Sequence, residues 1–304
     1  MKNATATIIF ILLTALSVVG CVAPTTALSP ENASADDSAD AAAPADDTLT
    51  FVTTTGTQAF TLAELKAALP TATLTVDDPV YEQAKTYEGF WLDDLLSYTK
   101  LLDAEGDMIL FRAADGYETR LDREQMQQAT ARGLVAFRDM ETEDGWEPFT
   151  RGKAEMVPAP FYLVWAAAEE ASAETFSWNA WPWPYQLTNI EMIDFATTYD
   201  RLYPPEIEET TTEHEGFKLF TETCLKCHSI NLQGGVEGPE LNIPQNITEY
   251  RDQETLMAFI KDPTSFRAGS KMPPMGEKLS DEEIDTILAY ITWMADHKQE
   301  QAEP

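Results

Sequence analysis

Residues 224–228 have the sequence Cys-Leu-Lys-Cys-His, and this pentapeptide decides what the surrounding chain must fold around. On a helical turn, two thiols separated by two residues match the two vinyl groups on one porphyrin edge, and Cys-x-x-Cys-His is the attachment signature for c-type haem. The adjacent His228 would lie beneath the iron, for which imidazole is a good axial donor. The motif predicts one covalent haem c held by Cys224 and Cys227, with His228 as proximal ligand.

Two other kinds of site use a closely spaced cysteine pair. A structural zinc site needs four ligands, and the chain has no second cysteine pair and only His214 and His297 as further histidines. A thioredoxin-like redox motif follows a strand in a β-α-β unit, a pattern that this part of the sequence lacks. Haem attachment is therefore the favoured interpretation.

The segments around the pentapeptide resemble class I cytochromes c. Residues 216–220 (Gly-Phe-Lys-Leu-Phe) resemble the first helix of that family, whose glycine and aromatic residues pack on the last helix. Residues 238–241 (Gly-Pro-Glu-Leu) resemble the loop in which a proline carbonyl accepts a hydrogen bond from the proximal histidine, so Pro239 would orient His228. A capping box at residues 280–283 begins an amphipathic final helix. The resemblance implies an all-α cytochrome c domain over residues 206–304.

Residues 269–274 (Gly-Ser-Lys-Met-Pro-Pro) resemble the segment that delivers the distal methionine in that family. The resemblance gives Met272 as the second iron ligand, with Met275 as the alternative, and a bis-histidine site using His214 or His297 stays open. A His–Met pair favours reduced iron, which suits electron transfer. With both axial positions filled by protein, we expect an electron carrier and no enzyme.

The N-terminus carries an export signal. One lysine is followed by an apolar run from residue 8 to residue 16, which is too short for a comfortable membrane span. The run ends in Val-Val-Gly-Cys at residues 18–21, which resembles the lipobox of bacterial lipoproteins. The resemblance implies a signal peptide over residues 1–20 and lipidation of Cys21, which would anchor the protein to a bacterial membrane facing the periplasm or the exterior. The alternative is a signal peptide with an incidental cysteine. Residues 21–48 indicate a flexible acidic tether.

Residues 49–205 predict an α+β domain. A hairpin is expected around Gly56, and a capping box at Thr61 and Glu64 predicts a short helix that ends before Pro70. A further helix is predicted over residues 89–102, and strands over residues 72–76, 107–114, 118–122, 160–170 and 187–195.

Parts of this domain, at residues 87–96, 112–119, 160–165 and 183–195, resemble the molybdopterin-binding fold of the sulfite oxidase group. Those enzymes hold molybdenum through a cysteine, whereas residues 49–203 contain neither cysteine nor histidine. The resemblance therefore implies a related fold without the cofactor, which docks partners or binds a ligand. Trp178, Trp181 and Trp183, with Tyr185, predict aromatic packing within the domain, with an aromatic binding groove as the alternative.

The chain is strongly acidic, with 20 Lys and Arg against 52 Asp and Glu and a net charge of −32. Such a surface repels phosphate backbones, so nucleic-acid binding is excluded as a function. It favours redox partners with a basic docking surface, or solvation in a salty medium. We expect an exported, membrane-anchored monohaem cytochrome that carries single electrons. The alternatives are an electron-accepting haem subunit of a larger oxidoreductase complex, docked through the N-terminal domain, and a haem-based gas sensor.

Overall fold

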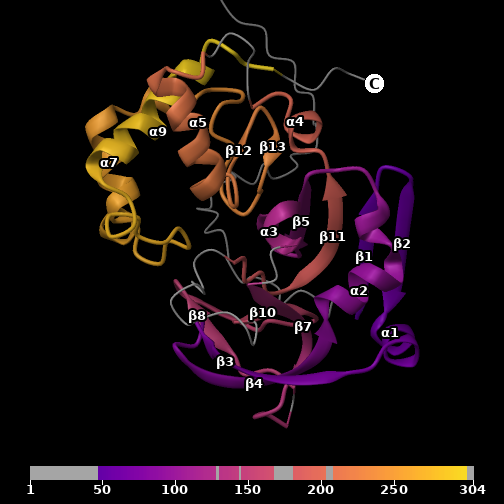
Figure 1. The fold of residues 1–304 in the computed structure, drawn as a ribbon. Coiled ribbons are helices and arrows are strands. Elements are labelled where there is room, and N and C mark those ends of the chain that lie inside the picture. The colour runs from indigo at the N-terminus through magenta and orange to yellow at the C-terminus, as the bar shows by residue number, and fades with distance from the viewer. Residues whose placement is uncertain (1–46, 128–129, 144, 168–180, 203–207, 300–304) are drawn as a thin grey trace, which may run out of the picture. The chain divides into compact units, whose positions relative to one another are not determined.

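The computed structural model describes residues 47–127, 130–143, 145–167, 181–202 and 208–299 (Figure 1). By their internal contacts, these described residues form one compact unit. The predicted signal peptide, Cys21 and nearly all of the tether lie outside the described residues. Within the described ranges, no helix has both the length and the apolar character needed to cross a bilayer.

Two sheets build the part that we call the sheet region, residues 48–202. The first has the order β2-β1-β11-β5-β6, in which β1 and β11 are parallel and the other neighbours antiparallel. The second has the antiparallel order β10-β7-β4-β3. A separate hairpin consists of β8 and β9. The strands are β1 Thr48–Thr53, β2 Gly56–Thr61, β3 Ala72–Asp78, β4 Gln83–Trp91, β5 Met108–Ala113, β6 Glu118–Asp122, β7 Ala131–Asp139, β8 Phe149–Arg151, β9 Ala154–Met156, β10 Tyr162–Ala167 and β11 Leu187–Ile193.

Short helices connect these strands. The helix α1 begins with the predicted capping box, because the Thr61 side chain accepts from the N–H of Glu64 and the Glu64 carboxylate accepts from the N–H of Thr61. The main apolar core contains buried residues from both sheets together with α1 and α2, including Phe51, Leu65 and Leu95. The helical elements are α1 Leu62–Ala68, α2 Leu92–Thr99, the 3₁₀ turn η1 Leu101–Asp103, α3 Arg123–Gln127 and α4 Phe195–Thr198.

Most predicted elements of the sheet region are present, but one boundary is wrong. The helix predicted over residues 89–102 begins only at Leu92, because Gly89–Trp91 complete β4 and pair with β7. The strands β4, β7, β8 and β9 are absent from the sequence-based prediction. Trp181 packs on Trp165 with ring centroids 4.5 Å apart, as expected for core packing, whereas Trp178 lies outside the described residues.

The remaining described residues, 208–299, form what we call the helical region (Figure 1). The prediction of an all-α domain needs one small correction, because two short strands pair in an antiparallel ribbon. This ribbon closes the loop directly after the pentapeptide. The elements are α5 Thr212–Thr223, β12 Ser229–Ile230, β13 Gln233–Gly234, α6 Ile247–Tyr250, α7 Gln253–Lys261, α8 Pro263–Phe266 and α9 Asp281–Met294.

The helices α5 and α9 pack closely at Gly216, as the resemblance implies. A Cβ atom at residue 216 would overlap the Thr286 carbonyl oxygen and lie 2.7 Å from the Cβ of Tyr290. The Tyr290 ring then contacts Phe217 and Phe220, with centroids 5.7 and 5.4 Å apart. Glycine at this position therefore sets how near the first and last helices approach.

The two regions share a hydrophobic core. Tyr199 and Leu202, at the end of the sheet region, belong to the same buried cluster as Phe220 and Ile287. The Tyr290 hydroxyl also donates a hydrogen bond of 2.7 Å to the Leu202 carbonyl. The predicted boundary at residue 205 therefore falls between segments that pack against each other.

Candidate functional site

The pentapeptide continues the helical turn at the end of α5. The N–H of Cys224 donates to the Phe220 carbonyl at 2.8 Å, and the N–H groups of Cys227 and His228 donate to the Cys224 carbonyl at 3.1 and 2.9 Å. Both sulfurs therefore come from one turn of backbone, which is the arrangement that attachment to two neighbouring vinyl groups requires.

The two thiols form no disulfide, and both have a raised pKa. Burial raises the pKa of the Cys224 thiol to about 12. Burial, reinforced by the Glu237 carboxylate, also raises the pKa of the Cys227 thiol to about 12. Redox-active Cys-x-x-Cys motifs instead have a lowered thiol pKa, so the structure argues against thiol–disulfide exchange.

The His228 ring is held in one orientation. Its Nδ1 lies 2.9 Å from the Pro239 carbonyl oxygen, and because a carbonyl only accepts, Nδ1 carries the proton. The lone pair of Nε2 is then free to coordinate a metal. The ring rests on Gly238, where an added Cβ would lie 2.7 Å from Nδ1. Burial lowers the pKa of His228, which favours the neutral ring that metal binding needs.

Glu240 fixes the loop that presents the Pro239 carbonyl. Its carboxylate accepts hydrogen bonds of 2.9–3.2 Å from four backbone N–H groups, those of Asn231, Leu232, Asn242 and Ile243. Glu240 lies in the Gly-Pro-Glu-Leu segment, but no feature of the sequence distinguishes it from the 51 other acidic residues. Sequence reasoning therefore missed this role.

Three fully buried asparagines extend the same support to α9. The Asn242 side chain donates to Asn231 at 2.7 Å, and the Asn246 side chain donates to Asn242 at 2.8 Å and to the Ile291 carbonyl at 2.7 Å. Asn231 donates in turn to the His297 carbonyl at 2.9 Å. All three exposed fractions are 0%. The spacing of these asparagines in the sequence gives no signal of this chain of hydrogen bonds.

The two candidate methionines lie on the segment between α8 and α9 in different surroundings. Met275 packs against the core of the helical region, and its N–H donates to the Ile260 carbonyl at 3.1 Å. Met272 is half-buried, and its N–H donates to the Ser270 hydroxyl at 3.2 Å. Met275 thus serves as a core residue, while Met272 lies on the less anchored part of the loop.

The other histidines are occupied elsewhere. The His297 ring stacks on Trp293 with centroids 3.5 Å apart, and its Nδ1 lies 2.8 Å from the Trp293 carbonyl oxygen. His214 is half-buried on α5, with its ring 6.4 Å from that of Phe217. In the described part of the chain, His, Cys, Asp and Glu form no cluster of three or more that could hold a metal ion, which disfavours a zinc site.

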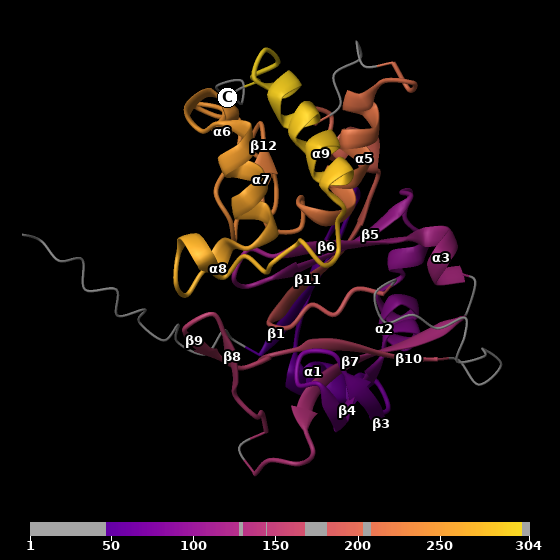
Figure 2. The same ribbon diagram turned by 90° about the vertical axis from the view of Figure 1, so that its left-hand side faces the viewer.

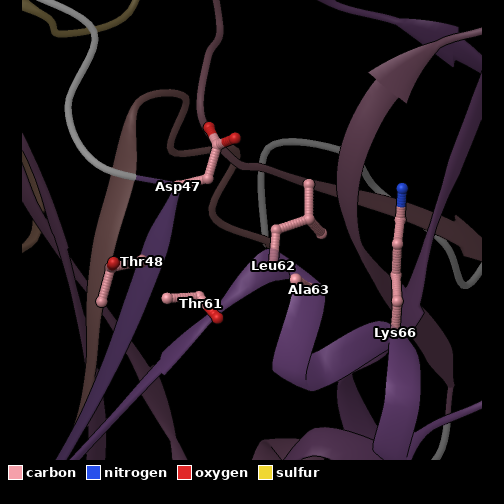
Figure 3. Close-up of a pocket in the computed structure, with 6 residues that line it drawn as sticks. All are labelled: Asp47, Thr48, Thr61, Leu62, Ala63 and Lys66. Atoms are coloured by element: carbon pink, nitrogen blue, oxygen red, sulfur yellow. The ribbon is translucent and has the colours of Figure 1, made fainter.

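A pocket beside the first hairpin offers no comparable chemistry. Figure 3 shows its lining, in which Lys66 and Asp47 are the charged residues. It contains no cysteine, histidine or methionine, so we place the functional site at the pentapeptide. The pocket residues are Asp47, Thr48, Thr61, Leu62, Ala63 and Lys66.

Comparison with known proteins assigns the helical region. The family described as cytochrome c oxidase, cbb3-type, subunit III matches residues 211–291. The chain is 30% identical over 104 residues to cytochrome c type-1 of Ascaris suum, covering 91% of that protein and 29% of this chain. The chain belongs to the cytochrome c family. Its cytochrome c domain carries covalently bound haem c and makes it an electron-transfer haem protein.

Two further relatives of the chain are named as oxidase subunits. The chain is 27% identical over 161 residues to cytochrome c oxidase subunit 2 of Alkalihalophilus pseudofirmus, covering 48% of this chain and 46% of the relative. It is 26% identical over 110 residues to the cbb3-type cytochrome c oxidase subunit FixP of Sinorhizobium medicae, covering 35% and 38%. The chain therefore spans less than half the length of these two curated relatives.

The residues of this chain fit haem c. Two unpaired thiols lie on one turn, and a neutral imidazole next to them keeps Nε2 free because the Pro239 carbonyl occupies Nδ1. The loop behind that carbonyl is held by Glu240 and the buried asparagines.

Proposed function

We propose that this protein is an exported, lipid-anchored cytochrome c that carries single electrons between redox partners. Haem c, when bound, supplies an iron that cycles between Fe(II) and Fe(III). Cys224 and Cys227 attach the porphyrin, His228 and Met272 ligate the iron, and Pro239 orients His228. Cys21, as the lipidated residue, anchors the chain to a bacterial membrane on the periplasmic or exterior side.

One observation carries the assignment of the proximal ligand. The hydrogen bond from His228 Nδ1 to the Pro239 carbonyl fixes both the tautomer and the plane of the ring. Such a partner on the far nitrogen raises the basicity of the coordinating nitrogen. The Pro239 carbonyl is itself held in place, because the carboxylate of the next residue, Glu240, accepts hydrogen bonds from four backbone N–H groups. A histidine that only filled space would not need a hydrogen-bond partner fixed in this way.

The surroundings of the two methionines favour Met272 over Met275 as the distal ligand. The Met275 side chain packs against the core. Its N–H donates to the Ile260 carbonyl of α7, and its carbonyl accepts from the N–H of Leu279. Met272 has no such packing and stands beside two prolines at residues 273 and 274, which stiffen the loop. Met272 as ligand would leave no open position for a gas on the iron, so the gas-sensor alternative predicts that Met272 is easily displaced.

Absorption spectra of the exported protein, oxidised and reduced, test these assignments. We expect a covalent haem in the wild type and loss of the Met-to-iron charge-transfer band in Met272→Leu. The matched variant Met275→Leu is expected to keep the band. Retention of the band in Met272→Leu would overturn the distal assignment, and ready binding of carbon monoxide to the reduced wild type would favour the gas sensor.

A second candidate function is the electron-accepting haem subunit of a larger oxidoreductase complex, docked through the sheet region. The similarity to two proteins named as oxidase subunits supports it. We further propose that the sheet region is a cofactorless relative of the sulfite oxidase molybdopterin-binding fold. Co-purification of the membrane-extracted protein with a larger cofactor-bearing subunit would favour the complex over a free carrier.

The acidic surface supports a partner with a basic docking face. At a net charge of −32, electrostatic steering predicts association rates that fall as salt rises. Stopped-flow electron transfer to a basic and to an acidic acceptor at two ionic strengths measures this. A rate that does not depend on salt with the basic acceptor would contradict the proposed docking.

A further inference from the structure

The edge of the five-stranded sheet contacts the haem-attachment segment through backbone groups. The N–H of Glu118 donates to the Lys226 carbonyl at 2.8 Å, and the N–H of Val236 donates to the Gly116 carbonyl at 2.9 Å. Because β6 is an edge strand, its outer backbone groups have no neighbouring strand to bind. The loop around the pentapeptide uses this edge.

An arginine of the sheet region forms an ion pair with the same segment. The Nη1 of Arg151, at the end of β8, lies 3.0 Å from Oε1 of Glu237 and donates to the Tyr185 hydroxyl at 2.6 Å. The other oxygen of Glu237 accepts from the Cys227 thiol at 3.4 Å. The exposed fraction is 24% for the Arg151 side chain and 6% for that of Glu237. The ion pair is thus largely desolvated beside a haem-attaching sulfur.

Haem attachment changes what this carboxylate can bind. When the thiol of Cys227 adds across a vinyl group, a sulfur–carbon bond forms, the vinyl double bond becomes single, and the thiol hydrogen ends on the adjacent vinyl carbon. The resulting thioether has no hydrogen to donate. Glu237 then keeps Arg151 as its partner, and an unpaired buried carboxylate is unfavourable.

The turn of the same hairpin contacts the loop that leads to Met272. A Cβ atom at Gly152 would lie 3.0 Å from the Ser270 carbonyl oxygen, and one at Gly269 would lie 2.7 Å from the Lys153 side chain. Figure 2 shows the β8–β9 hairpin below α8, the helix from which this loop continues. One hairpin therefore contacts both the segment that attaches haem and the segment that carries the proposed distal ligand.

We propose that Arg151 is a positioning residue for the haem, through which the sheet region sets the reduction potential of the cytochrome c domain. Arg151 neutralises Glu237 beside Cys227 and anchors the hairpin on both haem loops. Reduction adds an electron to the iron, so a nearby positive charge stabilises the reduced state and a negative charge opposes it. The inference deepens the proposed function and rests on haem attachment at Cys224 and Cys227.

Redox titration of the full-length, haem-loaded protein tests this with charge-matched variants. We expect Arg151→Gln to lower the reduction potential, Glu237→Gln to raise it, and the double variant to return close to the wild type. Arg138→Gln and Glu254→Gln remove the same charges from exposed positions of β7 and α7 and are expected to leave the potential nearly unchanged. Arg151→Lys, which keeps the charge, is expected to retain most of the wild-type potential.

A structural readout accompanies the potential. Hydrogen exchange at the Val236 and Gly238 N–H groups, which donate to Gly116 and Cys227, is expected to speed up in Arg151→Gln and to stay slow in Arg138→Gln. Reduction potentials that shift in the same direction in Arg151→Gln and Glu237→Gln, or that shift no more than in the exposed controls, would overturn this inference and leave the proposed function standing. If Arg151→Gln fails to accumulate, Arg151→Lys and Glu237→Gln decide it. A wild-type chain without covalent haem would refute the proposed function itself.

Discussion

The sheet region and the loops around the pentapeptide are held together by different means. In the sheet region, long antiparallel and parallel ladders satisfy the backbone, and apolar side chains from both sheets fill the core. Residues 224–246 contain only two strands of two residues each, so isolated backbone hydrogen bonds and side chains satisfy the backbone there. Glu240 and the three buried asparagines do this work.

The contrast shows how a cofactor-binding loop stays rigid without regular structure. A ladder spreads its stability over many equivalent hydrogen bonds, so the loss of one of these bonds is diluted. A loop fixed by one carboxylate and a few amides concentrates its stability in those side chains. We therefore expect single polar substitutions to act locally, in the haem loops or in the sheets, according to which region holds the polar group.

The largest effect is expected at the one lysine of the sheet region that is fully buried among the described residues. Lys85 forms ion pairs with Asp139 at 2.6 Å and Glu147 at 2.7 Å. Lys85→Met leaves the fully buried Asp139 without its cation, and we expect a loss of about 3–5 kcal/mol in the free energy of unfolding. Chemical unfolding measures this free energy. We expect the haem spectrum of the variant to be unchanged, because Lys85 lies in the sheet region.

The matched control and the pH dependence sharpen this prediction. Lys66→Met, at an exposed position over the Phe137 ring, is expected to cost less than about 1 kcal/mol. Burial lowers the pKa of Lys85, but its hydrogen bonds to Asp139 and Glu147 hold the net pKa above the ordinary 10.5. The stabilisation is therefore present below pH 10.5 and is lost only as the pH rises through the higher folded value. Equal losses in both variants would contradict the prediction.

The counterpart in the haem loops is Glu240→Gln. An amide keeps one oxygen acceptor and loses the charge that four N–H groups share, so we expect a loss of about 2–3 kcal/mol. Faster hydrogen exchange is expected at residues 231 and 242, with the sheet region unchanged. Glu254→Gln, an exposed change on α7, should stay within about 0.5 kcal/mol. Exchange that rises equally in β7 would break the contrast between the regions.

A smaller effect is expected where α5 meets α9. Gly216→Ala places a Cβ into the Thr286 carbonyl and the Tyr290 side chain, which forces the helices apart at a cost of about 1–3 kcal/mol. Gly56→Ala, in the β1–β2 hairpin, has nothing within 4 Å of its added Cβ and is expected to change stability by less than about 0.5 kcal/mol. Thermal unfolding of both variants gives the comparison, and similar midpoints would refute it.

The smallest effects are expected at two equivalent helix starts, one in each region. Thr61→Ala and Ser280→Ala each remove a capping box and are each expected to cost about 1 kcal/mol. The cap hydrogen bonds lower the pKa of Glu64 and Glu283 below the ordinary 4.5. Their contribution is therefore present above pH 4.5 and is lost as the pH falls through the lower folded values. Melting curves from pH 7 to pH 3 measure this, and a cap that matters in one region only would contradict the prediction.

Two of the strands that the sequence did not predict, β4 and β7, show where local patterns fail. The strand β7 is central in its sheet and buried at most positions, so it lacks the alternation that marks a half-exposed strand. The strand β4 alternates, but one of its inward positions is Lys85, a residue that normally indicates solvent. Its burial depends on carboxylates more than 50 residues away along the chain, at Asp139 and Glu147.

The sequence by itself determined those features that depend only on residues close together in the chain. The pentapeptide sets the haem chemistry through its own spacing, and each capping box is complete within four residues. Only the tertiary structure decided the interactions between segments that are distant in the chain. These are the Arg151–Glu237 ion pair beside Cys227, the hydrogen bonds that link the buried asparagines to α9, and the hydrophobic core shared by the residues on either side of residue 205. The physical reason is that a charge or amide gains its partner, and its low exposure, from segments that only the folded chain brings together.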